Sequence, residues 1–142
     1  MIQGEGIKRI VLNRISSGKM WLSIGLTKYR IDNNIIHIRF CSTDKLASSW
    51  YKFNINPNTL TADYEVWICG NPDIYYLIPI EIIHQIYNDP EAYIDRRHPE
   101  IHVVSVNIDR HTVTYAKGGK KINMVLYFHA LLHNSTVPDD PF

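Results

Sequence analysis

The sequence predicts a single α+β domain with a mainly antiparallel sheet of about seven strands and one or two helices. Short runs of alternating apolar and polar residues, joined by turn residues, are typical of antiparallel strands. Two nearly continuous apolar runs, residues 64–69 and 74–78, indicate strands that are buried on both faces. A length of 142 residues fits one domain, which we place at residues 1–134, followed by a flexible tail at residues 135–142.

The centre of the predicted sheet is the unit formed by residues 62–87. The turn-forming sequence GNPD at residues 70–73 separates the two apolar runs. Pro79 then stands where the first turn of a helix tolerates proline, and isoleucines at positions 80, 82, 83 and 86 form one apolar helical face. The predicted order is therefore strand, tight turn, strand and helix.

Strands are predicted on both sides of this unit. They comprise residues 7–12, 20–31, 35–41 and 50–55 before it, and residues 101–108 and 112–116, which form a hairpin, after it. Lys8 and Arg9 suit an edge strand, and Gly25 marks a bulge or bend in the second run. The polar stretch before residue 50 contains a short helical turn near residues 45–47, and residues 123–133 have the composition of a C-terminal helix or of the start of a strand.

The two halves of the chain differ in charge. Residues 1–60 carry nine Lys and Arg against three Asp and Glu, a balance of +6, whereas residues 61–142 carry six against eleven, a balance of −5. A basic half with interleaved aromatic residues is typical of a nucleic-acid-binding surface, because phosphate neutralisation supplies most non-specific affinity. Alternatively, the halves neutralise one another within the fold or across a homodimer.

Basic and aromatic side chains on neighbouring predicted strands form the candidate nucleic-acid surface. Lysine and arginine fit backbone phosphates, and aromatic rings offer stacking faces for unpaired bases. The set consists of Lys28, Arg30, Arg39, Trp50, Tyr51 and Lys52. The same strands would also present an ordinary solvated polar face, with Trp50 in the core; the concentration of positive charge favours binding.

Other chemistry has less support in the sequence. The histidine pair at positions 129 and 133 lacks the acidic residue of His-Glu-x-x-His. The pair at positions 98 and 102 straddles a loop–strand boundary, where a spacing of four does not by itself bring two rings together. Structural histidines are therefore favoured over a metal site. Cys41 and Cys69 lie in apolar strands, as is typical of buried, reduced thiols. The sequence GGKK at residues 118–121 is a basic turn that could contact a phosphate, although such turns are more often solvated hairpin ends.

Residues 50–87 resemble the later part of the compact nuclease core of the PD-(D/E)XK, or restriction-endonuclease-like, superfamily. The sequences DYEVWI at residues 63–68 and YYLIPIE at residues 75–81 are similar to the segment that follows the catalytic strands in small members. The resemblance implies a DNA-binding protein of nuclease-like architecture, with Mg²⁺ as cofactor if it is catalytic.

Such nucleases need an Asp and a Glu-x-Lys on adjacent strands, which hold the metal and steady the attacking water. The corresponding positions here are Asp32, as the metal ligand, and His37-Ile38-Arg39. Histidine thus replaces the acid and arginine the lysine. An arginine does not deprotonate in a protein and activates water poorly, but it can still clamp a phosphate.

The family's helix before the aspartate, with its own acidic residue, has no expected counterpart because residues 7–12 read as a strand. Asp63, Glu65 and Glu81 are alternative metal ligands, although ordinary structural roles are commoner for such residues. The chain is therefore expected either to be a metal-dependent DNA endonuclease with Asp32, His37 and Arg39 in its site, or to bind DNA without cutting it.

A second class of function is a non-catalytic protein-interaction module, for example a phage or mobile-element accessory protein. The acidic half would then meet a basic partner or a second copy through Asp89, Glu91, Asp95 and Glu100. The sequence has no signal-peptide pattern and no apolar run of ~20 residues, which predicts a cytoplasmic protein without membrane association. A homo-oligomer is compatible with this pattern.

Overall fold

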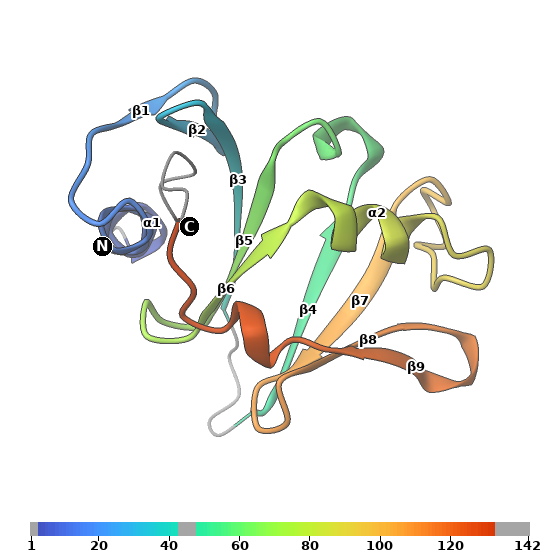
Figure 1. Cartoon of the computed structure of the whole chain (residues 1–142). Coiled ribbons are helices and arrows are strands. Elements are labelled where there is room, and N and C mark those ends of the chain that lie inside the picture. Colours follow the sequence, from blue (N-terminus) through green and yellow to red (C-terminus); the bar gives the residue numbers. More distant parts are fainter. Residues whose placement is uncertain (1–2, 43–47, 133–142) are drawn as a thin grey trace, which may run out of the picture.

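Two β-sheets pack against each other in the computed structural model, which describes residues 3–42 and 48–132 (Figure 1). Sheet A has the order β1-β2-β3-β5-β6 and is antiparallel except for the β3–β5 pair. Sheet B has the order β4-β7-β8-β9 and is antiparallel throughout. The strands are β1 (Trp21–Ser23), β2 (Lys28–Ile31), β3 (Asn34–Cys41), β4 (Trp50–Ile55), β5 (Tyr64–Cys69), β6 (Tyr75–Pro79), β7 (His102–Asn107), β8 (Thr112–Ala116) and β9 (Lys120–Asn123).

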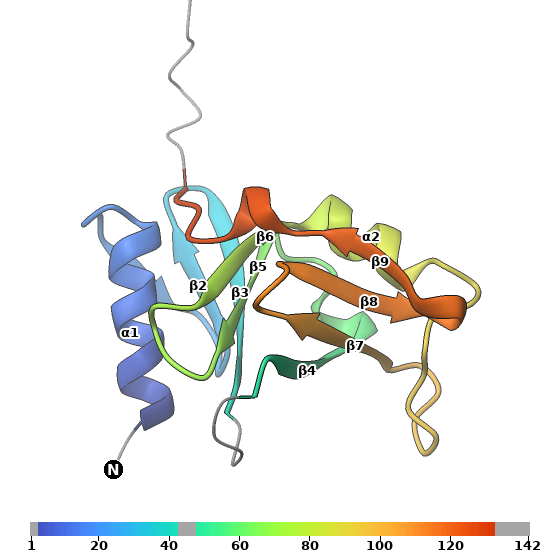
Figure 2. The ribbon, with the colours of Figure 1, turned by 90° about the horizontal axis from the view of Figure 1, so that it is seen from below.

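Two helices complete the two cores. Helix α1 (Gln3–Ile15) packs Val11, Leu12 and Ile15 on the face of sheet A that is turned away from sheet B (Figure 2). Helix α2 (Ile80–Tyr87) places Ile83 and Ile86 in the core between the sheets. Two short 3₁₀ segments, Pro57–Thr59 and Lys117–Gly119, join strands, and Val125–Tyr127 forms another after β9. Neither described helix is long and apolar enough to cross a membrane.

The predicted α+β class is confirmed, with two helices and nine strands in the described part of the chain. The arrangement differs from the single sheet expected from sequence. Alternation of apolar and polar residues identifies a strand but does not say which strand lies beside it. Strand β4 belongs to sheet B and not to sheet A, and β3 therefore pairs with β5. Sheet B then forms from β4 and the later hairpins.

The central unit of β5, β6 and α2 is where the sequence predicted it. Strand β5 is buried at every position after Tyr64 and lies between β3 and β6. Strand β6 is the last strand of sheet A, but it is also buried, and its Tyr76 forms a bridge with Phe128 of the C-terminal segment. Pro79 has φ −60° and precedes the first turn of α2, in agreement with its predicted place.

The prediction of a strand at residues 7–12 was wrong, because this segment lies inside α1. Gly4 and Gly6 weaken the intrinsic helix preference of the segment. Tertiary packing outweighs that weakness, since Val11 and Ile15, four residues apart, are both fully buried on one helical face. A helix with an acidic residue, Glu5, in its first turn therefore does precede the strands of sheet A.

Two further predictions differ from the structure. The single strand expected at residues 20–31 is two strands, β1 and β2, which pair antiparallel with Trp21 opposite Ile31. The helix expected at residues 123–133 is absent over residues 123–132: β9 ends at Asn123, one short 3₁₀ turn follows, and Phe128 then pairs with β6. The predicted turn near residues 45–47 and the predicted tail at residues 135–142 lie outside the described residues.

Candidate nucleic-acid interface

Asp32, the predicted metal ligand, lies in the turn between β2 and β3. Its φ of 55° is the left-handed conformation that Asp tolerates in tight turns, and its Oδ2 accepts a hydrogen bond from Lys19 Nζ at 3.1 Å. The hairpin register puts Lys28 opposite His37, at the end of the hairpin away from this turn. The structure therefore does not bring Asp32 together with His37.

His37 and Arg39 lie instead against a buried carboxylate, Glu65. The β3–β5 register pairs His37 with Glu65 and Arg39 with Trp67. Glu65 Oε2 lies 3.6 Å from His37 Nδ1, and Oε1 lies 4.0 Å from Arg39 Nε. Oε1 also accepts a hydrogen bond from Trp67 Nε1 at 2.8 Å, and Oε2 accepts one from the Thr59 hydroxyl at 3.4 Å. We call these five residues the Glu65 cluster.

The chemistry of the Glu65 cluster is that of a buried ionic contact. Burial lowers the pKa of Arg39, and the neighbouring Glu65 carboxylate opposes that effect. Divalent cations such as Mg²⁺ prefer several oxygen ligands and retained waters, whereas this cluster surrounds one fully buried carboxylate with a guanidinium, an imidazole and an indole. Over residues 3–42 and 48–132, no group of three or more His, Cys, Asp or Glu is placed to hold a metal.

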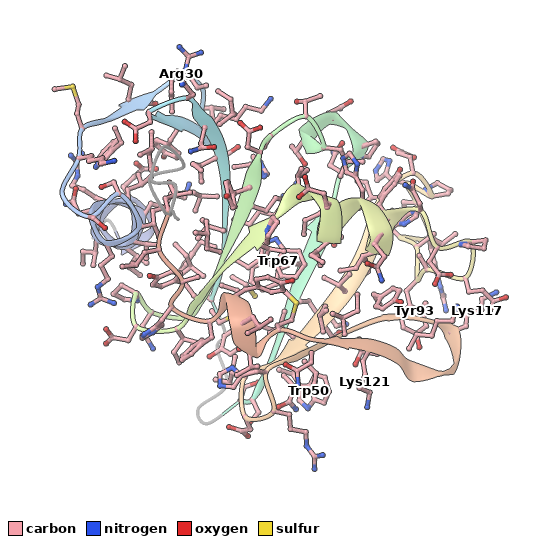
Figure 3. The ribbon with its side chains drawn as sticks, viewed as in Figure 1. Arg30, Trp50, Trp67, Tyr93, Lys117 and Lys121 are labelled. Carbon is pink, nitrogen blue, oxygen red and sulfur yellow. The ribbon has the colours of Figure 1, made fainter. Side chains whose placement is uncertain are left out.

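The six residues predicted to bind nucleic acid are divided between the two sheets. Lys28 and Arg30 are on β2, and Arg39 belongs to the Glu65 cluster. Tyr51 is buried in the core between the sheets, where its hydroxyl packs against Gly70. Trp50 and Lys52 share the exposed side of β4, whose residues alternate between exposed and buried. Figure 3 shows Arg30 and Trp50 in widely separated parts of the molecule.

Trp50 and Lys52 belong to a larger surface, which we call the outer face of sheet B. The strand register places Lys52 beside Ser105, Ser105 beside Thr114, and Thr114 beside Lys121. Opposed residues in antiparallel strands point to the same side, so these four side chains form one row across the sheet. A parallel row runs along Trp50, Asn107, Thr112 and Asn123.

The outer face is polar and carries positive charge without negative charge. Strands β4, β7, β8 and β9 contain no Asp or Glu. Two acidic residues at the rim are engaged elsewhere: Asp109 accepts a hydrogen bond from Ser49, and Asp89 accepts one from Lys120 at 2.9 Å. The Glu91 backbone amide and the Lys120 ammonium hold the pKa of Asp89 below its usual value. Lys52 and Lys121 are left as exposed cations at either side of the hydroxyl row.

Sequence reasoning identified only part of this surface. Trp50 and Lys52 were in the predicted set, and the basic turn at residues 118–121 was noted as a possible phosphate contact. Ser105 and Thr114 were missed, because nothing in the sequence says that β7 and β8 lie between β4 and β9. The sequence signal that could have found them is that polar residues alternate with apolar ones in the two hairpin strands and that none of these polar residues is acidic.

The two cysteines, His102 and His129 have packing roles. Cys41 and Cys69 are neighbours in the β3–β5 register and are free thiols, and burial raises the pKa of both. His129 stacks between Tyr75 and Phe128, and His102 stacks on Tyr87 with ring centroids 4.0 Å apart. These contacts are those of histidines that pack with aromatic neighbours.

Comparison with known proteins yields little sequence similarity. No family model matches the sequence, and no curated protein matches it. Among solved structures, a bacterial homing endonuclease, I-Ssp6803I, is similar over 90% of this chain and 85% of its own, with a TM-score of 0.49 and 9% identity. A similarity of this degree does not establish a shared fold, and it does not show that this chain binds or cleaves DNA.

Proposed function

We propose that this protein binds DNA through the outer face of sheet B. One observation carries the proposal: four adjacent strands present Lys52, Ser105, Thr114 and Lys121 in a single row, and none of these strands contains an acidic residue. In a chain whose net charge is only +1, this polar surface holds two exposed cations that form no ion pair within residues 3–42 and 48–132. That surface complements a polyanion.

The side chains of the row suit contacts with the phosphate backbone. Lysine ammonium groups neutralise phosphates and release counterions, and hydroxyl groups donate hydrogen bonds to phosphate oxygens. Neighbouring strands are about 4.8 Å apart, so that the Cα atoms of Lys52 and Lys121 are roughly 14 Å apart. The two cations therefore reach different phosphates rather than one.

Cleavage is a separate question from binding. The finer hypothesis, a Mg²⁺-dependent endonuclease with Asp32, His37 and Arg39 in its site, draws on the resemblance to restriction-endonuclease-like proteins. The helix that this resemblance requires before the strands is present as α1, with Glu5 in its first turn. Nicking of supercoiled plasmid with and without Mg²⁺, in the natural protein and in Asp32→Ala, tests this hypothesis; cleavage that survives Asp32→Ala would contradict the assigned ligand.

Binding is tested by fluorescence anisotropy of a labelled duplex at 50 mM and 200 mM salt, conditions between which phosphate contacts weaken strongly. The variant Lys52→Ala/Lys121→Ala should lower the slope of log affinity against log salt by about two, since each lysine neutralises about one phosphate. The matched variant Lys28→Ala/Arg30→Ala removes the same charge from sheet A and should lose much less. Equal losses in both variants, or an affinity that does not respond to salt, would refute the proposal.

Two of the four acidic residues of the alternative interaction surface, Asp89 and Asp95, are occupied by hydrogen bonds within the fold. Asp89 pairs with Lys120, and Asp95 Oδ1 accepts hydrogen bonds from the backbone amides of Arg97 and His98 at 2.8 and 3.0 Å. These amides lower the pKa of Asp95. Carboxylates used in this way stabilise turns, so the geometry favours the outer face of sheet B over the acidic half as the binding surface.

A further inference from the structure

Trp50 is an exposed aromatic ring on a rigid backbone. Its side chain is 52% exposed, whereas Trp67 is fully buried and Trp21 packs edge-on against Tyr29. Among the described aromatic residues, none stacks on Trp50. The backbone of Trp50 pairs with β7, and its N–H donates a hydrogen bond to Ser48 Oγ at 3.2 Å. A large apolar ring is thus exposed at the edge of the polar sheet, and a ligand that covers it gains the free energy of burying its apolar surface.

Tyr93 provides a second ring at the other end of the same face. Its segment runs between β7 and β8: Tyr93 N donates to Tyr115 O at 3.0 Å, and Val103 N donates to Tyr93 O at 2.9 Å. The flanking residues Ala92 and Ile94 pair with Ala116 and His102. Ala92 is buried and Tyr93 is 38% exposed, while Ile94 pairs with His102, which stacks on Tyr87 of α2. Alternation along this extended segment therefore turns the Tyr93 ring toward the outer face of sheet B.

The two rings lie at opposite sides of the lysine row. Tyr93 adjoins Val103, and the register places Val103 opposite Asn54, four residues along β4 from Trp50. This corresponds to about 13 Å along the strand direction. Lys52 and its row lie midway, and Figure 3 shows Lys121 between Trp50 and Tyr93 in this view. Along the strand direction, the face therefore presents the Trp50 ring, then the row of lysines and hydroxyl groups, and then the Tyr93 ring.

This arrangement suits an unpaired strand better than a duplex. In a duplex the base faces are stacked on one another, and the major groove is about 12 Å wide, narrower than a sheet whose outer Cα atoms alone are roughly 14 Å apart. A duplex could thus use the lysines but not the rings. An unpaired strand offers free base faces as well as phosphates, and four-stranded sheets with exposed aromatic rings are known to stack two or three unpaired bases.

We propose that the outer face of sheet B binds single-stranded DNA, with Trp50 and Tyr93 each stacking on a base and Lys52 and Lys121 contacting the intervening phosphates. This inference rests on the proposed function and names its substrate class. Charge complementarity between the four acid-free strands and the phosphate backbone favours a nucleic acid as the occupant, and the two exposed rings favour its unpaired form.

The test measures anisotropy with a labelled oligothymidylate, a duplex of the same length and an oligouridylate at one low salt concentration. The natural protein should bind the oligothymidylate about a hundredfold more tightly than the duplex, the contribution of two stacked bases at about tenfold each. Trp50→Leu and Tyr93→Leu should each lower that preference by about tenfold, and Trp50→Phe should restore most of it. A merely structural role for Trp50 would not change the ratio of the two affinities.

The outcomes separate the two proposals. Salt-dependent duplex binding through Lys52 and Lys121 without any preference for the oligothymidylate would overturn this inference and leave the proposed function standing. Binding to none of the three oligomers would overturn both. A clear preference for the oligouridylate would make RNA the occupant and would overturn the assignment to DNA. Thermal unfolding of each variant checks that the exposed substitutions leave the fold intact.

Discussion

Strands β4 and β5 form a natural comparison, because each has six residues with one tryptophan and one charged side chain. In β5 both groups are buried: Trp67 and Glu65 are 0% exposed and hydrogen-bond to each other. In β4 both groups are on the surface, since Trp50 and Lys52 share the exposed side. Similar residue types therefore stabilise the fold in one sheet and are available to a ligand in the other.

The difference follows from the solvation of each strand. Glu65 has lost its water, and a buried carboxylate is tolerated only when hydrogen bonds and opposite charge compensate it. Trp67 and Thr59 donate hydrogen bonds to the Glu65 carboxylate, and the Arg39 guanidinium supplies opposite charge at 4.0 Å. Lys52 keeps its hydration and has no acidic residue on its strand or the three strands beyond it, so its charge acts outward.

The largest effect is expected for the buried tryptophan. Trp67→Ala should lower the free energy of unfolding by about 4–5 kcal/mol, because it opens a cavity beside the stacked Phe53 ring and removes the donor to Glu65. Trp50→Ala, the matched exposed substitution, should change it by less than about 0.5 kcal/mol. Urea denaturation of the two variants measures both values. Similar losses in the free energy of unfolding would contradict the different roles of the two tryptophans.

The second-largest difference in stability between the strands is expected when the charge is removed from each of them. Glu65→Gln should lower the free energy of unfolding by about 3 kcal/mol, because the glutamine can still accept from Trp67 but leaves the partly buried Arg39 guanidinium without its counter-charge. Lys52→Met should be nearly neutral for stability. Denaturant melts give both numbers, and a stable Glu65→Gln protein would show that the Glu65 cluster is not a compensated ionic contact.

The smallest effect is expected where β5 meets β4. Gly70 follows β5 with φ +84°, and an added Cβ would lie 2.9 Å from the Tyr51 hydroxyl of β4. Gly70→Ala should therefore destabilise by about 1–3 kcal/mol through backbone strain plus displacement of Tyr51. Gly118→Ala has the same strain at φ +80° but meets no atom within 4 Å, so it should cost less. Thermal melts that rank the two variants the other way would contradict the contact between the sheets.

Local patterns correctly predicted those parts of the fold whose neighbours in space are also neighbours in sequence. The β5–β6–α2 unit and the β7–β8 hairpin both join adjacent segments through short turns. Predictions failed at α1 and after β9. There, packing against sheet A holds a glycine-containing helix together, and the bridge from Phe128 to Tyr76 draws an apolar segment away from helix.

By itself the sequence determined the α+β class, the buried central strands and the concentration of basic and aromatic residues in the first half of the chain. Only the tertiary structure decided that β4 joins a second sheet, that His37 and Arg39 face Glu65, and that Lys52 shares a surface with Lys121. The physical reason is that alternation and turn residues are local properties of the chain. Which strands become neighbours depends on the total apolar surface buried by the whole arrangement, and that arrangement decides which charges remain exposed to a ligand.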